Sequence, residues 1–297
     1  MRNMSINTLL KLSSLIATVF LASLIGQTQA TNSGSQSPFV AREAQSLFIS
    51  HVKPKMQLAT TTATRDPHAV TLLTQALNVA GSTATVSAIQ DFTATGNVTY
   101  YWNESALGTV TVKGRGLRQS RIDASGKSGV QSWVINNDKA FQKSPDGSIL
   151  PLPTQNTVRP VSATFPLLEL FSVIQDTTVS VSDGGLVTQN GHQVHDIQIQ
   201  KTFPANSDPV GYLSKISKAH IFVDANDLTI LSIKDTVYPR NGGPGEYTHE
   251  MQFSSYQTVN GVLVPFTVTE LVAGQRTAIF QFNQISFNTG LTDSDFQ

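Results

Sequence analysis

Residues 245–287 read GEYTHEMQFSSYQTVNGVLVPFTVTELVAGQRTAIFQFNQISF, and this stretch decides the fold of the chain. Asn260-Gly261 lies near its centre, with alternating apolar and polar residues on both sides. The residues that share the apolar face are Tyr247, His249, Met251, Phe253, Val262, Val264, Phe266 and Val268. Successive side chains of a strand point to opposite faces, and Asn-Gly favours a two-residue turn. The pattern therefore predicts an antiparallel hairpin, and a third strand to Phe287 extends it into a sheet with one apolar face.

The first thirty residues have the layout of a secretory signal peptide. Arg2 and Lys11 give a positive start, Leu12–Ile25 is a diluted apolar run, and Thr28-Gln29-Ala30 offers a cleavage site. The apolar run is too short to span a bilayer, which takes about 20 residues. The chain has no cysteine, so disulfides, thiolate nucleophiles and cysteine-bound metals are excluded. We expect a bacterial periplasmic or secreted protein with no integral membrane segment after cleavage.

The charge of the chain gives no basis for nucleic-acid binding. Lys and Arg number 20, Asp and Glu number 20, and only 13% of residues are charged. Removing residues 1–30 removes two basic groups and no acidic ones, so the charge becomes 18 − 20 = −2. A nucleic-acid partner needs a basic patch, and no such patch stands out. We therefore expect no nucleic-acid partner.

Composition and capping signals divide the rest of the chain into an arm and one domain. Residues 31–65 are Ser/Thr-rich and predict a flexible arm, followed by a domain over residues 66–297. Asp66 is a suitable N-cap, Pro67 suits the first helical position and Gly81 suits the end, which predicts a helix over 67–80. A second helix is expected in PLLELFSVIQ, residues 166–175, with Thr164 as its cap.

Alternating segments between and after these helices predict short strands. Besides the three C-terminal strands, the segments are residues 91–102, 108–123, 131–136, 139–143, 148–150, 178–183, 193–203, 219–224 and 228–238. From these twelve segments we expect about ten or eleven strands in all. Helix, strands, helix, strands is an order typical of the α+β class with an antiparallel sheet.

Candidate catalytic and metal-binding residues are few. His192 and His195 are the closest approach to a metal site, but residues three apart on a strand point to opposite faces. His249 is expected to be a hydrogen-bonded residue of the core or of a cavity wall. No nucleophile has a recognised catalytic setting such as G-x-S-x-G. We therefore predict no enzyme activity, no metal and no cofactor, with a hydrolase of unrecognised site as the weakest alternative.

The apolar residues are the better candidates for function. The 166–175 helix is apolar around most of its circumference, so it must be covered on more than one side. The sheet offers an apolar face to receive it, and the space between forms either a packed core or a ligand cavity. The candidate cavity residues are Val110, Val112, Phe165, Leu168, Phe171, Ile197, Ile199, Tyr247, His249, Met251, Phe253, Val262, Val264 and Phe266.

The closing residues suggest a family. Tyr256, the run NGVLVP at 260–265 and the ending FNTGLTDSDF at 287–296 resemble the periplasmic outer-membrane lipoprotein-carrier (lipoprotein-sorting) superfamily. The resemblance covers residues 66–297. It implies an incomplete β-barrel, a strongly curved antiparallel sheet covered by helices, with an apolar concave face that accepts lipid or lipoprotein acyl chains.

The resemblance leads to two functional hypotheses. The first is non-enzymatic periplasmic binding of a lipid, acyl chain or other apolar ligand. The second is an envelope protein-interaction or stress-sensing module that has a filled core and no ligand.

Overall fold

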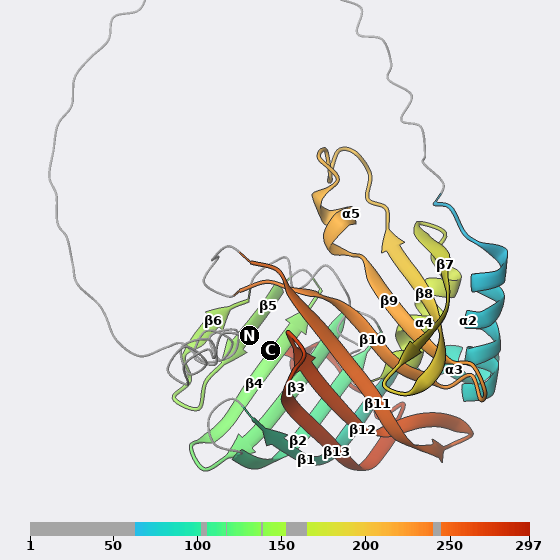
Figure 1. Cartoon of the computed structure of the whole chain (residues 1–297). Helices are drawn as coiled ribbons and strands as arrows, with labels where there is room; N and C mark the ends of the chain where they lie inside the picture. The colour runs from blue at the N-terminus through green and yellow to red at the C-terminus, as the bar shows by residue number, and fades with distance from the viewer. Residues whose placement is uncertain (1–62, 102–105, 117, 138, 153–164, 240–244) are drawn as a thin grey trace, which may run out of the picture.

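The computed structural model describes residues 63–101, 106–116, 118–137, 139–152, 165–239 and 245–297 (Figure 1). The strands are β1 (Asp91–Tyr100), β2 (Ala106–Arg115), β3 (Gln119–Gly126), β4 (Gly129–Asn136), β5 (Lys139–Lys143), β6 (Ile149–Pro151), β7 (Val179–Gln189), β8 (His192–Lys201), β9 (Ala219–Asp224), β10 (Ile230–Val237), β11 (Tyr247–Val259), β12 (Val262–Val272) and β13 (Gln275–Phe287). The helices are α2 (Pro67–Ala80), α3 (Ser82–Ser87), α4 (Pro166–Gln175), α5 (Tyr212–Ile216) and the 3₁₀ helix η2 (Asp293–Phe296).

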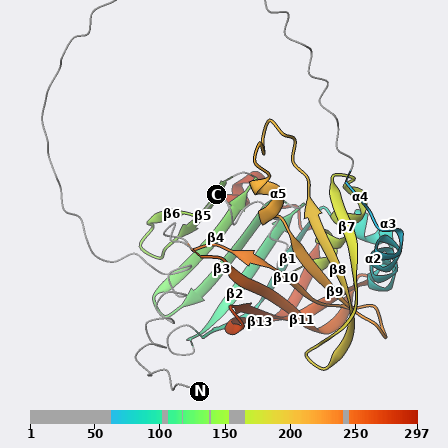
Figure 2. The same cartoon turned by 45° about the horizontal axis from the view of Figure 1, so that its top comes forward.

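All the strands belong to one antiparallel sheet. Its order is β6-β5-β4-β3-β2-β1-β13-β12-β11-β10-β9-β8-β7, so every pairing of adjacent strands but one joins strands that are consecutive in the chain. The exception is the pairing of β1 with β13, which joins the two halves of the sheet. Among the described residues β6 and β7 are the two edges and do not pair, so the sheet is open. Figures 1 and 2 show it strongly curved.

The predicted antiparallel curved sheet is confirmed, but the predicted number of strands was wrong. The described residues form 13 strands, where about ten or eleven were expected. One difference lies in residues 108–123, which form parts of two strands instead of one. Gly116 has φ of +55°, in the left-handed region that suits glycine, and the chain turns there between β2 and β3. The alternation of this segment covers only Thr109 to Arg115, and the prediction carried the same strand past the turn.

The predicted hairpin at the centre of the opening stretch is confirmed. Val259 of β11 pairs with Val262 of β12, which leaves Asn260 and Gly261 as the two-residue turn. Their φ angles are +50° and +80°, the signs that a type I′ turn requires at both positions. The right-handed twist of the two strands continues through such a turn.

Helix α2 has the bounds that its capping residues predict. The Asp66 carboxylate accepts a hydrogen bond from the Ala69 N–H at 2.8 Å, Pro67 opens the helix and Gly81 ends it at φ of +149°. Helix α4 begins at Pro166 as expected, but its N-cap is Phe165, which makes no capping side-chain bond. The predicted cap, Thr164, lies outside the described residues, as do the signal peptide and residues 31–62 of the arm.

Helix α2 connects two distant parts of the sheet. At its start, the Asp66 N–H donates to the Val181 carbonyl of β7 at 2.8 Å. At its end, a Cβ on Gly81 would lie only 3.0 Å from the Gly261 carbonyl oxygen in the β11–β12 turn. Helices α2, α3 and α4 lie together on this side of the molecule (Figure 1). None of the helices in the described ranges is long and apolar enough to cross a membrane.

The C-terminal tail is bound back onto the sheet. The Asp91 carboxylate accepts hydrogen bonds from the N–H groups of residues 289–291. Beyond them Phe296 is fully buried, with the Arg115 guanidinium 5.7 Å from its ring centroid. Arg115 also pairs with Asp293, and Lys113 pairs with Asp295 at 2.7 Å. These contacts bind η2 to β2, and they therefore contribute to the stability of the sheet.

We predict that the Phe296→Ala variant loses about 3–5 kcal/mol of unfolding free energy, because a fully buried phenylalanine leaves a cavity behind. Urea denaturation followed by circular dichroism measures the change. Ser294→Ala, an exposed position in the same 3₁₀ helix, is the matched control and should change the free energy by less than about 0.5 kcal/mol. Equal values for the two variants would show that the tail is not part of the folded unit.

Candidate functional site

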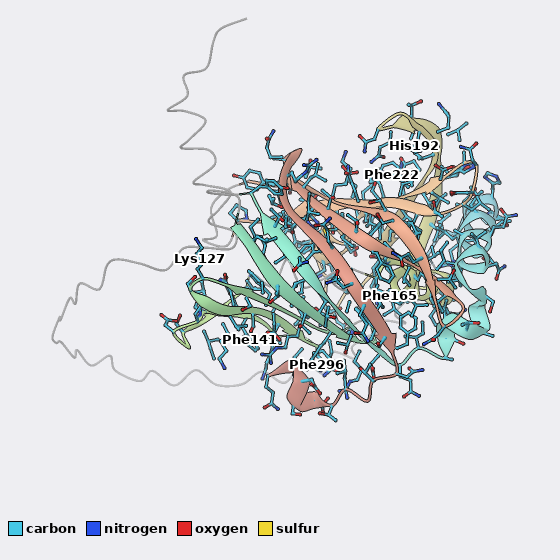
Figure 3. All side chains as sticks on the ribbon, turned by 90° about the horizontal axis from the view of Figure 1, so that it is seen from below. Lys127, Phe141, Phe165, His192, Phe222 and Phe296 are labelled. Carbon is cyan, nitrogen blue, oxygen red and sulfur yellow. The ribbon has the colours of Figure 1, made fainter. Side chains whose placement is uncertain are left out.

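The space between the helices and the sheet is filled by apolar side chains. Phe165, labelled in Figure 3, lies at the start of α4. The centroid of its ring is 5.1 Å from that of Phe92 on β1 and 5.4 Å from that of Phe287 on β13. Leu167, Leu168 and Leu170 of α4 are all buried. Since these three positions point in different directions around a helix, α4 is covered on more than one side, as its composition predicts.

The structure brings most of the predicted cavity residues together. All fourteen except Tyr247 and His249 belong to one continuous apolar cluster, with Phe171 at its partly buried border. The cluster draws on β1, β2, β8 and β11–β13 as well as α4. Whether these residues contact a ligand stays a prediction, because packing against one another accounts for their burial equally well.

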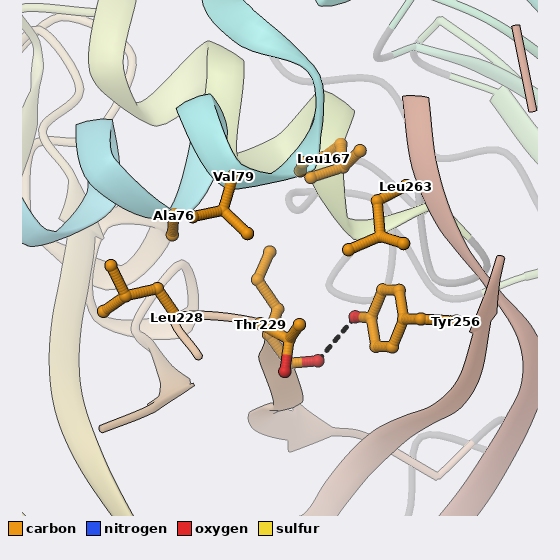
Figure 4. Close-up of a pocket in the computed structure, with 9 residues that line it drawn as sticks. Ala76, Val79, Leu167, Leu228, Thr229, Tyr256 and Leu263 are labelled. Carbon is orange, nitrogen blue, oxygen red and sulfur yellow. Dashed lines mark hydrogen bonds between the residues drawn. The ribbon is translucent and has the colours of Figure 1, made fainter. Parts of the chain in front are cut away.

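A small pocket opens between α2, α4 and the strands β10–β12 (Figure 4). It is lined by Ala76, Val79, Ala80, Leu167, Leu228, Thr229, Ile230, Tyr256 and Leu263. Val79 is 47% exposed at the rim. The Tyr256 hydroxyl donates to the Ile230 carbonyl at 2.6 Å and the Thr229 hydroxyl donates to the Asp227 carboxylate at 2.7 Å, so both hydroxyls of the lining are paired. Burial raises the pKa of this hydroxyl above its ordinary value, with a further contribution from the Asp227 charge.

The pocket is small, and sequence reasoning missed it. Its cavity volume is about 10 Å³, the room of about one water molecule, whereas typical small-molecule sites measure roughly 300–1,000 Å³. None of the fourteen predicted residues lines it. In the sequence, Val70, Leu73 and Leu77 form an apolar stripe on α2 that Ala76 and Val79 widen, which predicts that this side of the helix faces the protein. The stripe did not indicate that Tyr256 and Leu228, both more than 140 positions later, would complete the wall.

Arg65 fastens the C-terminal end of α4. Its guanidinium donates four hydrogen bonds to backbone carbonyls, at 3.0 and 3.1 Å to Val173 and Ile174 and at 2.9 Å to both Asp176 and Val179. The last carbonyls of a helix lack partners within the helix and carry partial negative charge, which a cation satisfies. Arg65 also forms a parallel β-bridge with Val181. The sequence prediction counted Arg65 in the arm, yet it contacts the domain.

His249 carries a charge on the predicted apolar face, near the N-terminal end of β11. His249 places its Nδ1 at 2.6 Å from the Asp235 carboxylate on β10 and its Nε2 at 3.4 Å from Glu270 on β12. The Thr277 hydroxyl donates to Glu270 at 2.7 Å. Burial alone lowers the pKa of His249, but the charges and hydrogen bonds of Asp235 and Glu270 outweigh it and raise the pKa to about 10. The imidazole is therefore charged near neutral pH and links three strands.

The two histidines considered as metal ligands have separate surroundings. His192 lies 3.2 Å from the Asp224 carboxylate, whereas the His195 ring lies edge-on to His68 at 6.5 Å between centroids. Within the described ranges, no group of histidine, aspartate and glutamate side chains is placed to hold a metal ion.

Comparisons with known proteins identify the fold. No family model and no curated protein matches the sequence. Among solved structures the chain is similar to an outer membrane lipoprotein-sorting protein domain from Vibrio parahaemolyticus, with a TM-score of 0.51 and 13% identity over 77% of this chain and 96% of that one. At this identity the likeness is one of fold, and the expected resemblance to lipoprotein-sorting proteins is confirmed at that level.

Two further solved structures match with similar coverage. A DUF1329 family protein from Desulfovibrio piger has a TM-score of 0.49 at 10% identity, over 77% of this chain and 96% of that one. A LolA superfamily protein from Nitrosomonas europaea has a TM-score of 0.48 at 9% identity, over 77% and 97%.

We predict that Arg65→Met releases the end of α4. Losing four hydrogen bonds from a charged donor should lower the protection of the α4 amides in hydrogen exchange by about tenfold or more, because each such bond stabilises by roughly 1 kcal/mol. Arg118→Met removes an exposed arginine and is the control that should leave α4 unchanged. Unaltered exchange in α4 of the Arg65 variant would contradict the role given to this side chain.

His249 predicts a pH-dependent contribution to stability. The folded pKa of about 10 lies above the unfolded value of 6.5, so the stabilisation is fully present below pH 6.5 and is lost as the pH rises through 10. The difference in unfolding free energy between the native protein and His249→Asn should therefore shrink steadily between these pH values. Urea denaturation at several pH values measures it, and a constant difference would contradict the assignment.

Proposed function

We propose that this chain is a non-enzymatic periplasmic or secreted protein that binds a lipid, an acyl chain or another apolar ligand. The ligand would lie between helices α2 and α4 and the concave face of the sheet. The observation that carries the proposal is the apolar pocket at this boundary, which opens to solvent beside Val79. A domain named for lipoprotein sorting has the same fold, which supports the same class of ligand.

The chemistry of the pocket supports an apolar ligand. Ala76, Leu167 and Leu263 present hydrocarbon, and the Tyr256 hydroxyl already has its acceptor in the Ile230 carbonyl. A ligand that offered a charged group here would lose its hydration without gaining a partner, which is costly. An alkyl chain would instead gain about 25 cal/mol for each Å² removed from water.

The size of the pocket sets a condition on binding. At about 10 Å³ it has room for about one water molecule and for no alkyl chain. Any such ligand requires α2 and α4 to move away from the sheet, so that the predicted wall residues such as Phe165, Val264 and Phe266 exchange contacts with each other for contacts with the ligand. Exchange of one apolar contact for another costs little free energy compared with exposing the same surface to water.

The alternative is an envelope protein-interaction or stress-sensing module. The close packing of Phe165 against Phe92 and Phe287 favours this reading, because a filled interior needs no ligand. The two functions differ in one measurable respect. The binding protein takes up an apolar probe in the absence of any partner, and the interaction module does not.

We predict that Val79→Trp blocks the pocket and weakens probe binding by about tenfold or more, equivalent to 1.4 kcal/mol. The probe is N-phenyl-1-naphthylamine, whose fluorescence increases in apolar surroundings. Asn78→Trp adds the same side chain to the neighbouring exposed position, outside the pocket, and should bind the probe like the native protein.

Two results would contradict the proposed function. One is a native protein that does not bind the probe at all, which favours the interaction module. The other is equal binding by both tryptophan variants, which places the probe elsewhere. Thermal unfolding of both variants confirms that each is folded before binding is measured.

A further inference from the structure

Gln142 is a polar residue on the inner face of the sheet. It pairs with Trp133 across β5 and β4, Trp133 pairs with Ile122 on β3, and Ile122 pairs with Val112 on β2. Directly paired residues of neighbouring strands point to the same face of a sheet. Trp133 and Val112 belong to the main apolar cluster, so the Gln142 side chain points to the side on which that cluster lies.

The amide oxygen of Gln142 is buried without a hydrogen-bond partner among the described residues. The residue is only 3% exposed, and its Oε1 atom has no hydrogen-bond partner in the part of the chain that the structure describes. Buried amide oxygens in folded proteins are nearly always paired, because leaving one unpaired costs free energy. A leucine would fill the same space without that cost. The amide therefore needs an explanation that the packing of the protein alone does not supply.

An aromatic pair lies beside Gln142. Trp133 beside it packs against Tyr100, with 6.2 Å between the ring centroids. The row of paired residues that begins at Gln142 continues through Val112 to Ala94 on β1, close to Phe92 and the Phe165 ring. From β5 to β1 the row crosses four strand spacings, about 19 Å. An apolar track thus leads from the amide toward the helices.

We propose that the Gln142 amide oxygen accepts a hydrogen bond from the amide N–H of an N-acylated ligand, with the acyl chain lying along this row toward α4. The inference rests on the proposed function and names its ligand class. An amide N–H supplies the donor that Oε1 lacks. A free fatty acid carboxylate and an ester supply only acceptors, so either of them would leave Oε1 unpaired.

Matched ligands test this assignment. Isothermal titration calorimetry compares the binding of N-methyldodecanamide, which has one N–H, with that of N,N-dimethyldodecanamide, which has none. The native protein should prefer the first by about tenfold, the effect of one buried hydrogen bond. Gln142→Leu should bind both equally. Gln257→Leu, an exposed glutamine on β11, should keep the preference of the native protein.

The possible results distinguish a failure of the proposed function from a failure of the role given to Gln142. If the native protein binds neither amide nor the probe, the proposed function fails. If it binds both amides within twofold, ligand binding stands and the role of Gln142 is overturned. Because leucine removes an unpaired polar group, Gln142→Leu should also melt at or above the temperature of the native protein. A markedly lower melting temperature would show that the amide is paired within the folded chain, which overturns the inference as well.

Discussion

The burial of helix α4 on more than one side is the constraint on which the rest of the structure depends. A helix this apolar cannot lie on a surface, so it needs the sheet on one side and α2 on another. Arg65 satisfies the carbonyls at its C-terminal end, and Phe165 anchors its start between β1 and β13. Those two strands are where the halves of the sheet join. The same contacts thus hold the helix in place and tie it to the seam of the sheet.

Local chemistry accounts for what the sequence predicted well. Asp66, Pro67 and Gly81 set the ends of α2 because each satisfies a need of the helix terminus itself, and Asn260-Gly261 sets a turn in the same way. The strand count failed at Gly116, where the chain turns just after the alternating residues 109–115 and the predicted strand had been continued to residue 123. Arg65 was missed for a different reason. Its carbonyl partners lie 108 to 114 positions further along the chain, and no local pattern reports such a pairing.

The candidate site follows the same division between local and distant information. Alternation along β2, β8, β11 and β12 was enough to find the apolar wall, because period-two patterns report which face is buried. The pocket needed Val79 and Tyr256 to meet, and the unpaired amide of Gln142 becomes visible only when burial and hydrogen bonding are known. The pocket departs from close packing, and the Gln142 oxygen departs from full hydrogen bonding. Proteins are expected to depart from these two rules of stability mainly at functional sites.

The central claim is that an apolar ligand lies between α2 and the sheet. The chain has no cysteine, so spin labels on Asn78→Cys and Gln257→Cys report the separation of α2 and β11 without interference. Both positions are exposed and lie outside the pocket lining. Pulsed electron resonance with and without saturating N-phenyl-1-naphthylamine measures the distance between the labels. A longer distance is expected when the probe is bound, and an unchanged distance with the probe bound would contradict the claim.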